Sequence, residues 1–275
     1  MHMDSDISPP LPALVSFAGI QKTFAAPEGD GTLVAVEGVD LTLEEGHILT
    51  ILGPSGCGKS TLLNMLAGIY KPTRGTVTYR GAQVSGLNLR TGYMTQNDHL
   101  LPWRRILANV RAPYEIAGMP RRSATAKAME LIDLVGLTGF ENAYPTQVSG
   151  GMRKRASLAR LLAYNPETLL LDEPFVALDA QLRLAMQAEL RSLARRLGKT
   201  VLFVTHDVDE AAALGDKCAV FTARPGRIRQ VVDIDLPADR DLMTLRQNPD
   251  YGRIAAKLWD LVTRESREGR ISHET

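Results

Sequence analysis

A glycine-rich segment that ends in a lysine and two hydroxyl residues carries the clearest chemical pattern in this sequence. Residues 53–61 read GPSGCGKST and match G-x-x-x-x-G-K-[ST], the pattern of a phosphate-binding loop. In such a loop the backbone N–H groups converge on phosphates, Lys59 reaches the outer phosphates and Ser60 binds Mg²⁺. A glycine-rich turn without a ligand is the alternative. The predicted nucleotide-binding residues of this loop are Gly53, Pro54, Ser55, Gly56, Cys57, Gly58, Lys59, Ser60 and Thr61.

Two adjacent carboxylates, Asp172 and Glu173, follow the apolar run 168–171. Ligands of open α/β sheets bind at the carboxyl ends of strands, so this position suits a site. Because side chains alternate along a strand, the two acids point in different directions and can do different jobs. We predict that Asp172 holds Mg²⁺, usually through water, and that Glu173 orients or deprotonates the water that attacks the γ-phosphate. Capping of the following turn is the alternative.

Gln96 and His206 each end a strand-like run, at 92–95 and 200–205. Taken alone, His206 fits a hydrogen-bonded core histidine and Gln96 a solvent-facing amide. Both are expected at the same rim of the sheet as the phosphate-binding loop and the acidic pair. There a neutral His206 imidazole could hydrogen-bond the γ-phosphate, and the Gln96 amide could contact the metal and the water.

A second helix N-terminus with open N–H groups is predicted at Ser149-Gly150-Gly151. Ser149 is a suitable N-cap for a helix that continues through Leu158 and Leu162, and the two glycines leave N–H groups free for an anion. One nucleotide does not need two such sites so far apart in the chain. We therefore predict that this segment serves a nucleotide held by another copy of the protein, although spacing alone also allows an ordinary capped helix.

The elements that must position these residues follow from the hydrophobic pattern. Continuous apolar runs at 48–52, 168–171 and 200–205 predict parallel strands covered on both faces by helices. Apolar residues at helical spacing between Leu182 and Leu197 predict a helix that joins two of these strands in a right-handed crossover. Alternating runs at 15–24 and 39–43 predict an antiparallel layer, so the predicted fold class is α/β.

The segment 97–155 differs from this alternation of strands and helices, because it contains helical patterns but no strong buried strand. We interpret it as a helical subdomain inserted into the α/β core. The predicted organisation is a flexible tail at 1–12, an ATP-binding core at 13–96 and 156–237, the helical subdomain at 97–155 and a C-terminal helical tail at 238–275.

Composition excludes several classes of protein. The 275 residues include 32 basic and 31 acidic side chains, a net charge of +1, and 44% are hydrophobic, which excludes a disordered chain. The balanced charge makes a nucleic-acid partner a minor hypothesis. Two cysteines are too few for a disulfide framework and fit a reducing compartment. With no apolar run of membrane-spanning length and no signal-peptide pattern, we expect a cytosolic chain.

Six ordered motifs between Val15 and Leu236 resemble those of the ATP-binding subunits of ABC transporters. They correspond to the Walker A motif (Gly53–Thr61), the Q-loop (Gln96), the signature (Ser149–Gly151), the Walker B motif (Leu169–Asp172, with Glu173), the D-loop (Ala177–Asp179) and the H-loop (Thr205–Asp207).

This resemblance implies an α/β P-loop NTPase core, RecA-like, with an antiparallel β layer and a helical subdomain. It also implies a head-to-tail homodimer in which ATP and Mg²⁺ at one Walker A motif are enclosed by Ser149, Gly150 and Gly151 of the partner. Phe24 matches the aromatic residue that stacks on adenine, and Asp179 of the D-loop joins the nucleotide-binding residues. Gln96 joins the metal-binding residues Ser60 and Asp172.

The same resemblance implies partners and a location. Two separate permease subunits would bind the helical subdomain, a solute-binding protein would act through them, and no nucleic acid would be involved. The chain would lie at the cytoplasmic face of the inner membrane as a peripheral subunit.

Two segments, Leu100–Trp103 and Ala223–Ile228, resemble the nitrate, sulfonate and taurine branch of importers. Departures from the family pattern are Val148, Met152, Lys154 and Val176. A P-loop small-molecule kinase and a non-transport ABC-type ATPase are the alternative functions. The sequence does not identify the transported solute.

Overall fold

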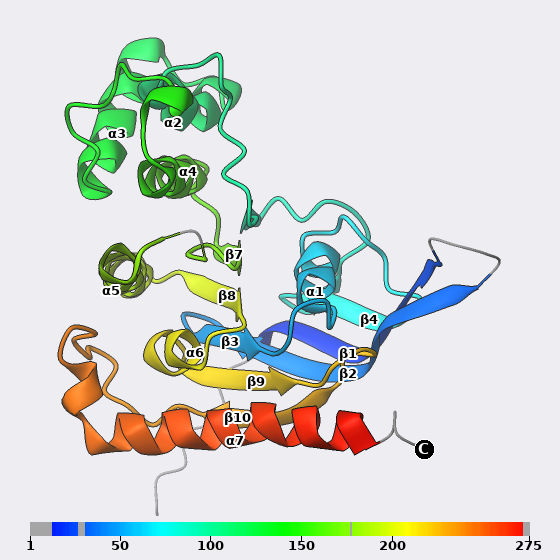
Figure 1. Ribbon diagram of the computed structural model, residues 1–275. Helices are drawn as coiled ribbons and strands as arrows, with labels where there is room; N and C mark the ends of the chain where they lie inside the picture. The colour runs from blue at the N-terminus through cyan, green and yellow to red at the C-terminus, as the bar shows by residue number, and fades with distance from the viewer. Residues whose placement is uncertain (1–12, 27–30, 177, 272–275) are drawn as a thin grey trace, which may run out of the picture.

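The computed structural model describes residues 13–26, 31–176 and 178–271 (Figure 1). The predicted flexible tail, residues 1–12, lies outside this part of the chain, and so does Ala177 of the D-loop.

A six-stranded sheet forms the centre of the fold, in the order β10-β9-β3-β8-β7-β6. Strands β9, β3, β8, β7 and β6 are parallel, whereas β10 is antiparallel to β9. The three apolar runs predicted as buried parallel strands are confirmed as β3, β7 and β8. The strands are β3 (Ile48–Leu52), β6 (Thr91–Met94), β7 (Thr168–Asp172), β8 (Thr200–Thr205), β9 (Lys217–Phe221) and β10 (Ile228–Asp233).

Both faces of the central strands β3, β7 and β8 are covered, which is why these strands are continuous apolar runs. On β3, Ile48 and Leu52 pack with helices α5, α6 and α7 on one face. Leu49 and Ile51 pack on the other face with α1 and with a second sheet. This second sheet is the predicted antiparallel layer, in the order β2-β1-β4-β5. Its strands are β1 (Ala13–Ala25), β2 (Thr32–Glu44), β4 (Arg74–Tyr79) and β5 (Ala82–Gln83).

The helices fall into two sets. Core helices follow strand ends, and the predicted crossover helix is confirmed as α5, with Gly198 in the left-handed region just beyond its C-cap at φ 58°. The second set, α2, α3 and α4, forms a separate group at one end of the molecule (Figure 1). The helices are α1 (Lys59–Leu66), α2 (Ile106–Ile116), α3 (Arg121–Leu134), α4 (Gly150–Ala163), α5 (Ala180–Arg196), α6 (Val208–Leu214) and α7 (Pro249–Ile271).

Helix α4 belongs to both parts of the fold. Its small residues Ala156, Ala159 and Ala163 pack into the cluster shared with α2 and α3. Its larger residues Leu158 and Leu162 pack into the core cluster of the parallel sheet. The predicted boundary between residues 155 and 156 therefore falls inside this helix, because two apolar faces run along one continuous element.

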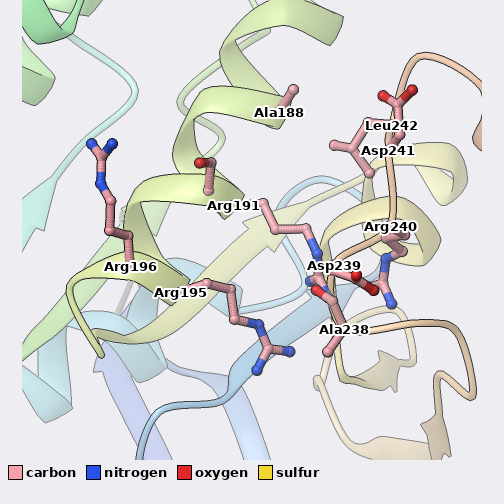
Figure 2. Close-up of a pocket in the computed structure, with 10 residues that line it drawn as sticks. Ala188, Arg191, Arg195, Arg196, Ala238, Asp239, Arg240, Asp241 and Leu242 are labelled. Atoms are coloured by element: carbon pink, nitrogen blue, oxygen red, sulfur yellow. The ribbon is translucent and has the colours of Figure 1, made fainter.

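The segment after β10 is tied to the core by buried arginines (Figure 2). Arg191 of α5 donates to the carbonyl of Ala238 at 3.1 Å, and Arg240 donates to that of Ala213 at 2.8 Å. Both side chains, drawn in Figure 2, line a hollow whose volume is about 490 Å³. Helix α7 then packs against α6 and along β10 (Figure 1). Among the described helices, none is both long enough and apolar enough for a membrane span.

Candidate functional site

A cavity of about 440 Å³ lies where the antiparallel layer, the phosphate-binding loop and the carboxyl ends of β6 and β7 meet. Most of the residues proposed for the nucleotide in a single chain line it. These are Phe24, Ser55, Gly56, Gly58, Lys59, Ser60, Thr61, Gln96, Asp172 and Glu173. Leu33, Ala35 and Arg224 line it as well and were not predicted, whereas Gly53, Pro54 and Cys57 do not line it.

The loop wraps around the buried ammonium of Lys59, whose residue is only 4% exposed. Lys59 Nζ donates to the carbonyls of Gly53 at 2.7 Å and Pro54 at 2.8 Å. Gly58 has φ 100° and lies so close to β2 that a Cβ there would be 2.5 Å from Val36 Cγ1. A side chain is excluded at this position on both grounds. The loop therefore presents a positive charge and bare backbone to the cavity.

Ser60 and Asp172 come together from α1 and β7. The Ser60 hydroxyl donates to Asp172 Oδ1 at 3.0 Å, and the Tyr93 hydroxyl donates to Asp172 Oδ2 at 3.3 Å. Burial raises the pKa of the Asp172 carboxyl above its usual 3.8, although these two hydrogen bonds oppose the shift. Tyr93 was not predicted, because its place in β6 gives no sequence signal for a contact with a distant strand.

Glu173 and His206 form the second polar pair. His206 Nδ1 lies 3.1 Å from Glu173 Oε2, and Lys59 Nζ lies 3.9 Å from Glu173 Oε1. Glu173 has φ 46°, in the left-handed region that non-glycine residues rarely adopt, and its N–H donates to the Val204 carbonyl at 3.0 Å. This backbone turn separates the direction of its carboxylate from that of Asp172. His206 contacts Glu173 but does not line the cavity itself.

The opposite wall of the cavity is apolar and aromatic. Phe24 of β1 packs edge-on against Tyr70, with ring centroids 5.5 Å apart. The Lys22 ammonium lies 5.1 Å from the centroid of Phe24. Phe24 lines the cavity together with Leu33 and Ala35, and this apolar wall suits a planar heterocycle, whereas the loop opposite suits phosphates. Tyr70 was not predicted.

Ser149, Gly150, Gly151 and Asp179 do not line this cavity. Ser149 caps α4 by accepting from the Met152 N–H at 3.2 Å, and Asp179 caps α5 by accepting from the Leu182 N–H at 2.9 Å. A Cβ at Gly151 would lie 2.3 Å from Leu182 Cδ2, so a larger residue there would displace the Leu182 side chain where α4 approaches α5. The structure thus separates the predicted residues into a group around the cavity and a group at two helix N-termini.

Helix α4 holds the loop that follows Gln96. The Lys154 ammonium donates a hydrogen bond to the Gln96 carbonyl, and Arg153 pairs with Asp98 at 3.0 Å. Ser157 donates to the Asp98 carbonyl at 2.8 Å. Burial lowers the pKa of Lys154 from its usual 10.5. Gln96 is therefore fixed by residues of α4, a link that was not predicted because it depends on contacts between distant segments.

Comparison with known proteins agrees with this geometry. The model of the ABC transporter family matches residues 36–176. An uncharacterised ABC transporter ATP-binding protein of Methanocaldococcus jannaschii is 48% identical over 207 residues, which cover 75% of this chain and 78% of that protein. The taurine import ATP-binding protein TauB of Roseobacter denitrificans is 37% identical over 90% of this chain and 94% of its own. TauB of Yersinia pestis is 43% identical over 70% of this chain and 76% of that protein.

A solved structure of a dimeric ATP-binding cassette bound to ADP and phosphate superposes with a TM-score of 0.73 at 30% identity. The match covers 81% of this chain and all of that one. The predicted α/β P-loop fold with its antiparallel layer and helical subdomain is confirmed. This chain belongs to the family of ABC transporter ATP-binding proteins, and it is an ATP hydrolase of that family.

Proposed function

We propose that this chain is the ATPase subunit of an importer for a small organic anion of the taurine or sulfonate type. The observation that carries the proposal is the cavity in which the phosphate-binding loop, Asp172, Glu173 and Gln96 converge, together with a signature segment that does not reach it. The taurine import proteins that this chain resembles support the class of solute.

Within one chain, the cavity residues bind and orient the nucleotide. Adenine lies against Phe24, and the phosphates replace the carbonyl oxygens that Lys59 now contacts. The Ser60 hydroxyl and the Asp172 carboxylate are hard oxygen ligands 3.0 Å apart, which fits Mg²⁺. When bound, Mg²⁺ neutralises charge on the β- and γ-phosphates.

Glu173 is the proposed general base. Its carboxylate faces the cavity next to Lys59, and His206 holds the other carboxylate oxygen at 3.1 Å. In this position Glu173 accepts a proton from the attacking water, while His206 stays within reach of the γ-phosphate. Gln96, two residues beyond β6, lines the cavity and would contact the metal and the water when these are bound.

The second half of each site comes from another copy. Ser149, Gly150, Gly151 and Asp179 lie outside the cavity of their own chain, and we propose that they contact the nucleotide of the partner in a head-to-tail homodimer. The dimeric form of the similar cassette bound to ADP and phosphate supports this arrangement.

A separate groove of about 660 Å³ between β6, α2 and α4 is the proposed permease contact. It is lined largely by apolar and aromatic side chains, among them Met94, Tyr114 and Ile116, and Ile116 is 87% exposed. Because β6 leads directly into Gln96, a permease segment in this groove would lie next to the nucleotide site. Two permease subunits and a solute-binding protein complete the proposed importer at the cytoplasmic face of the inner membrane.

The test uses the tagged chain purified from its own cells together with the membrane subunits that bind it. In proteoliposomes we expect taurine or alkanesulfonates, with their binding protein, to stimulate ATP hydrolysis, and neutral amino acids not to do so. Stimulation only by an unrelated solute would contradict the proposed substrate class. Hydrolysis that no solute stimulates, in a complex with an intact permease, would contradict import.

A further inference from the structure

The loop between β9 and β10 contacts the phosphate-binding loop through Arg224. Arg224 donates from Nε and Nη2 to the Gly56 carbonyl, at 3.1 and 2.8 Å. The same side chain lines the nucleotide cavity. Arg224 is not part of the Walker A motif, because it lies in the loop between β9 and β10, far from Gly53–Thr61 in the sequence.

Gly226 fixes the position from which Arg224 reaches the loop. The Gly226 N–H donates to the Ala35 carbonyl at 2.9 Å, and its carbonyl accepts from the Glu37 N–H at 3.0 Å. A Cβ at Gly226 would lie 1.9 Å from the Cys57 carbonyl oxygen, so the backbone packs directly on the phosphate-binding loop. Arg224 is therefore presented by a segment attached to both β2 and the loop it contacts.

The hydrogen bonds of Arg224 also set the direction of a neighbouring N–H. In a trans peptide the carbonyl oxygen and the following N–H point in opposite directions. Holding the Gly56 carbonyl toward the guanidinium therefore turns the Cys57 N–H the other way. Hydrogen bonds from a charged donor are stronger than neutral ones, and here two nitrogens converge on one oxygen.

We propose that Arg224 is a positioning residue for the nucleotide phosphates, a role that rests on the proposed function of the cavity. It holds the carbonyl of Gly56, a residue that lines the cavity, so that the backbone of the phosphate-binding loop keeps one orientation, and its charge at the cavity wall favours a polyphosphate. Arg224 takes no part in proton transfer, so its effect is on binding rather than on turnover.

The chain offers a matched control in Arg227 of the same loop. Arg227 pairs with Glu37 at 2.5 Å, its side chain is 60% exposed, and it does not line the cavity. We compare Arg224→Ala, Arg224→Lys and Arg227→Ala by calorimetric titration with MgADP and with adenosine, and by kcat at saturating MgATP. Adenosine has no phosphate, so it reports the adenine wall alone.

We expect Arg224→Ala to weaken MgADP binding about tenfold, the size expected for loss of a charged hydrogen bond. Adenosine binding and kcat should change less than about twofold. Arg224→Lys should recover part of the loss, because an ammonium can donate to one carbonyl but not through two nitrogens. Arg227→Ala should match the wild type in every measurement.

Unchanged MgADP affinity in Arg224→Ala would overturn the role of Arg224 while leaving the nucleotide site intact. Equal losses for MgADP and adenosine would also overturn it, because they would indicate general loosening of the loop. A wild-type chain that binds no MgADP would overturn the proposed function as well.

Discussion

The phosphate-binding loop and the signature segment both lead into helices, yet the N-termini of these two helices are capped in different ways. Helix α1 starts after Gly58, which has no side chain to accept a hydrogen bond from the first turn. Helix α4 starts after Ser149, whose hydroxyl accepts from the Met152 N–H. The first turn of α1 thus has no side-chain cap, whereas that of α4 is capped within its own chain.

This difference indicates which half of the proposed site depends on the nucleotide. The first residue of α1 is the buried Lys59, which donates to two backbone carbonyls of the loop, so phosphates change its surroundings directly. The segment before α4 is capped by its own Ser149, so the proposed contact with a partner does not need the nucleotide of the same chain. The experiments below separate the two halves.

The largest expected effect is on turnover, from Glu173→Gln. Glutamine keeps the shape of the side chain but cannot accept the proton, so hydrolysis should fall by a factor of about 10² to 10⁴. ATP binding, measured by titration with MgATP, should remain near the wild-type value because the loop is untouched. Hydrolysis at the wild-type rate would show that Glu173 is not the base.

Ser149→Arg should remove the contribution of α4 to the partner. In the Glu173→Gln background, size exclusion with MgATP should give a dimer, and adding Ser149→Arg should give a monomer that still binds ATP. Ser123→Arg, an exposed position on α3, is the matched control and should leave the dimer intact. A dimer that tolerates Ser149→Arg would contradict the head-to-tail arrangement.

Trp103→Ala tests the coupling of the helical subdomain to the permease. Trp103 is 72% exposed, so it does not pack in the interior of the subdomain and is free to contact another protein. In the proteoliposome assay we expect transport per ATP to fall about twofold to fivefold, on the scale of one exposed aromatic contact. Basal hydrolysis of the isolated chain should not change; an equal loss there would favour a structural role.

The smallest expected effect is on stability, from Asp172→Asn without nucleotide. The pKa of Asp172 is raised by burial, so the folded state holds its proton more tightly than the unfolded state does. Above the raised pKa the folded protein bears the cost of an ionised, partly buried carboxylate. That cost disappears as the pH falls below 3.8. At pH 7 the variant should melt about 1 to 3 °C higher than the wild type, and MgATP should stabilise it less.

At pH 3.5 that difference in melting temperature should shrink, since Asp172 is then largely protonated in both states. A variant less stable than the wild type at pH 7 would mean that the hydrogen bonds from Ser60 and Tyr93 outweigh the cost of burial.

The parts of the fold that the sequence predicted are those in which local pattern and burial agree. Strands β3, β7 and β8 are buried on both faces, so their apolar runs are continuous and easily recognised. Helix α4 was also predicted, but the domain boundary at 155 was placed inside it, because one helix carries an alanine face toward the helical subdomain and a leucine face toward the core.

Within the candidate site, the motif residues were predicted and their supports were not. Phosphate-binding loops constrain residue types at fixed spacing, so Lys59 and Ser60 stand out. Tyr93, Lys154 and Arg224 act on Asp172, Gln96 and Gly56 across long sequence distances. A tyrosine in a strand, a lysine in a helix and an arginine in a turn belong to no local sequence motif. Their contacts can therefore be identified only in the folded structure.

Helix α4 carries one further consequence for the proposed dimer. In the proposed dimer its first residue, Gly150, would contact the partner's nucleotide, and one turn later Lys154 holds the backbone of Gln96, which lines the chain's own cavity. A movement of this single helix would therefore change the affinity of both sites for their nucleotides. By thermodynamic linkage, each nucleotide must then alter the affinity for the other by the same factor, so the two sites of the dimer would bind cooperatively rather than as independent compartments.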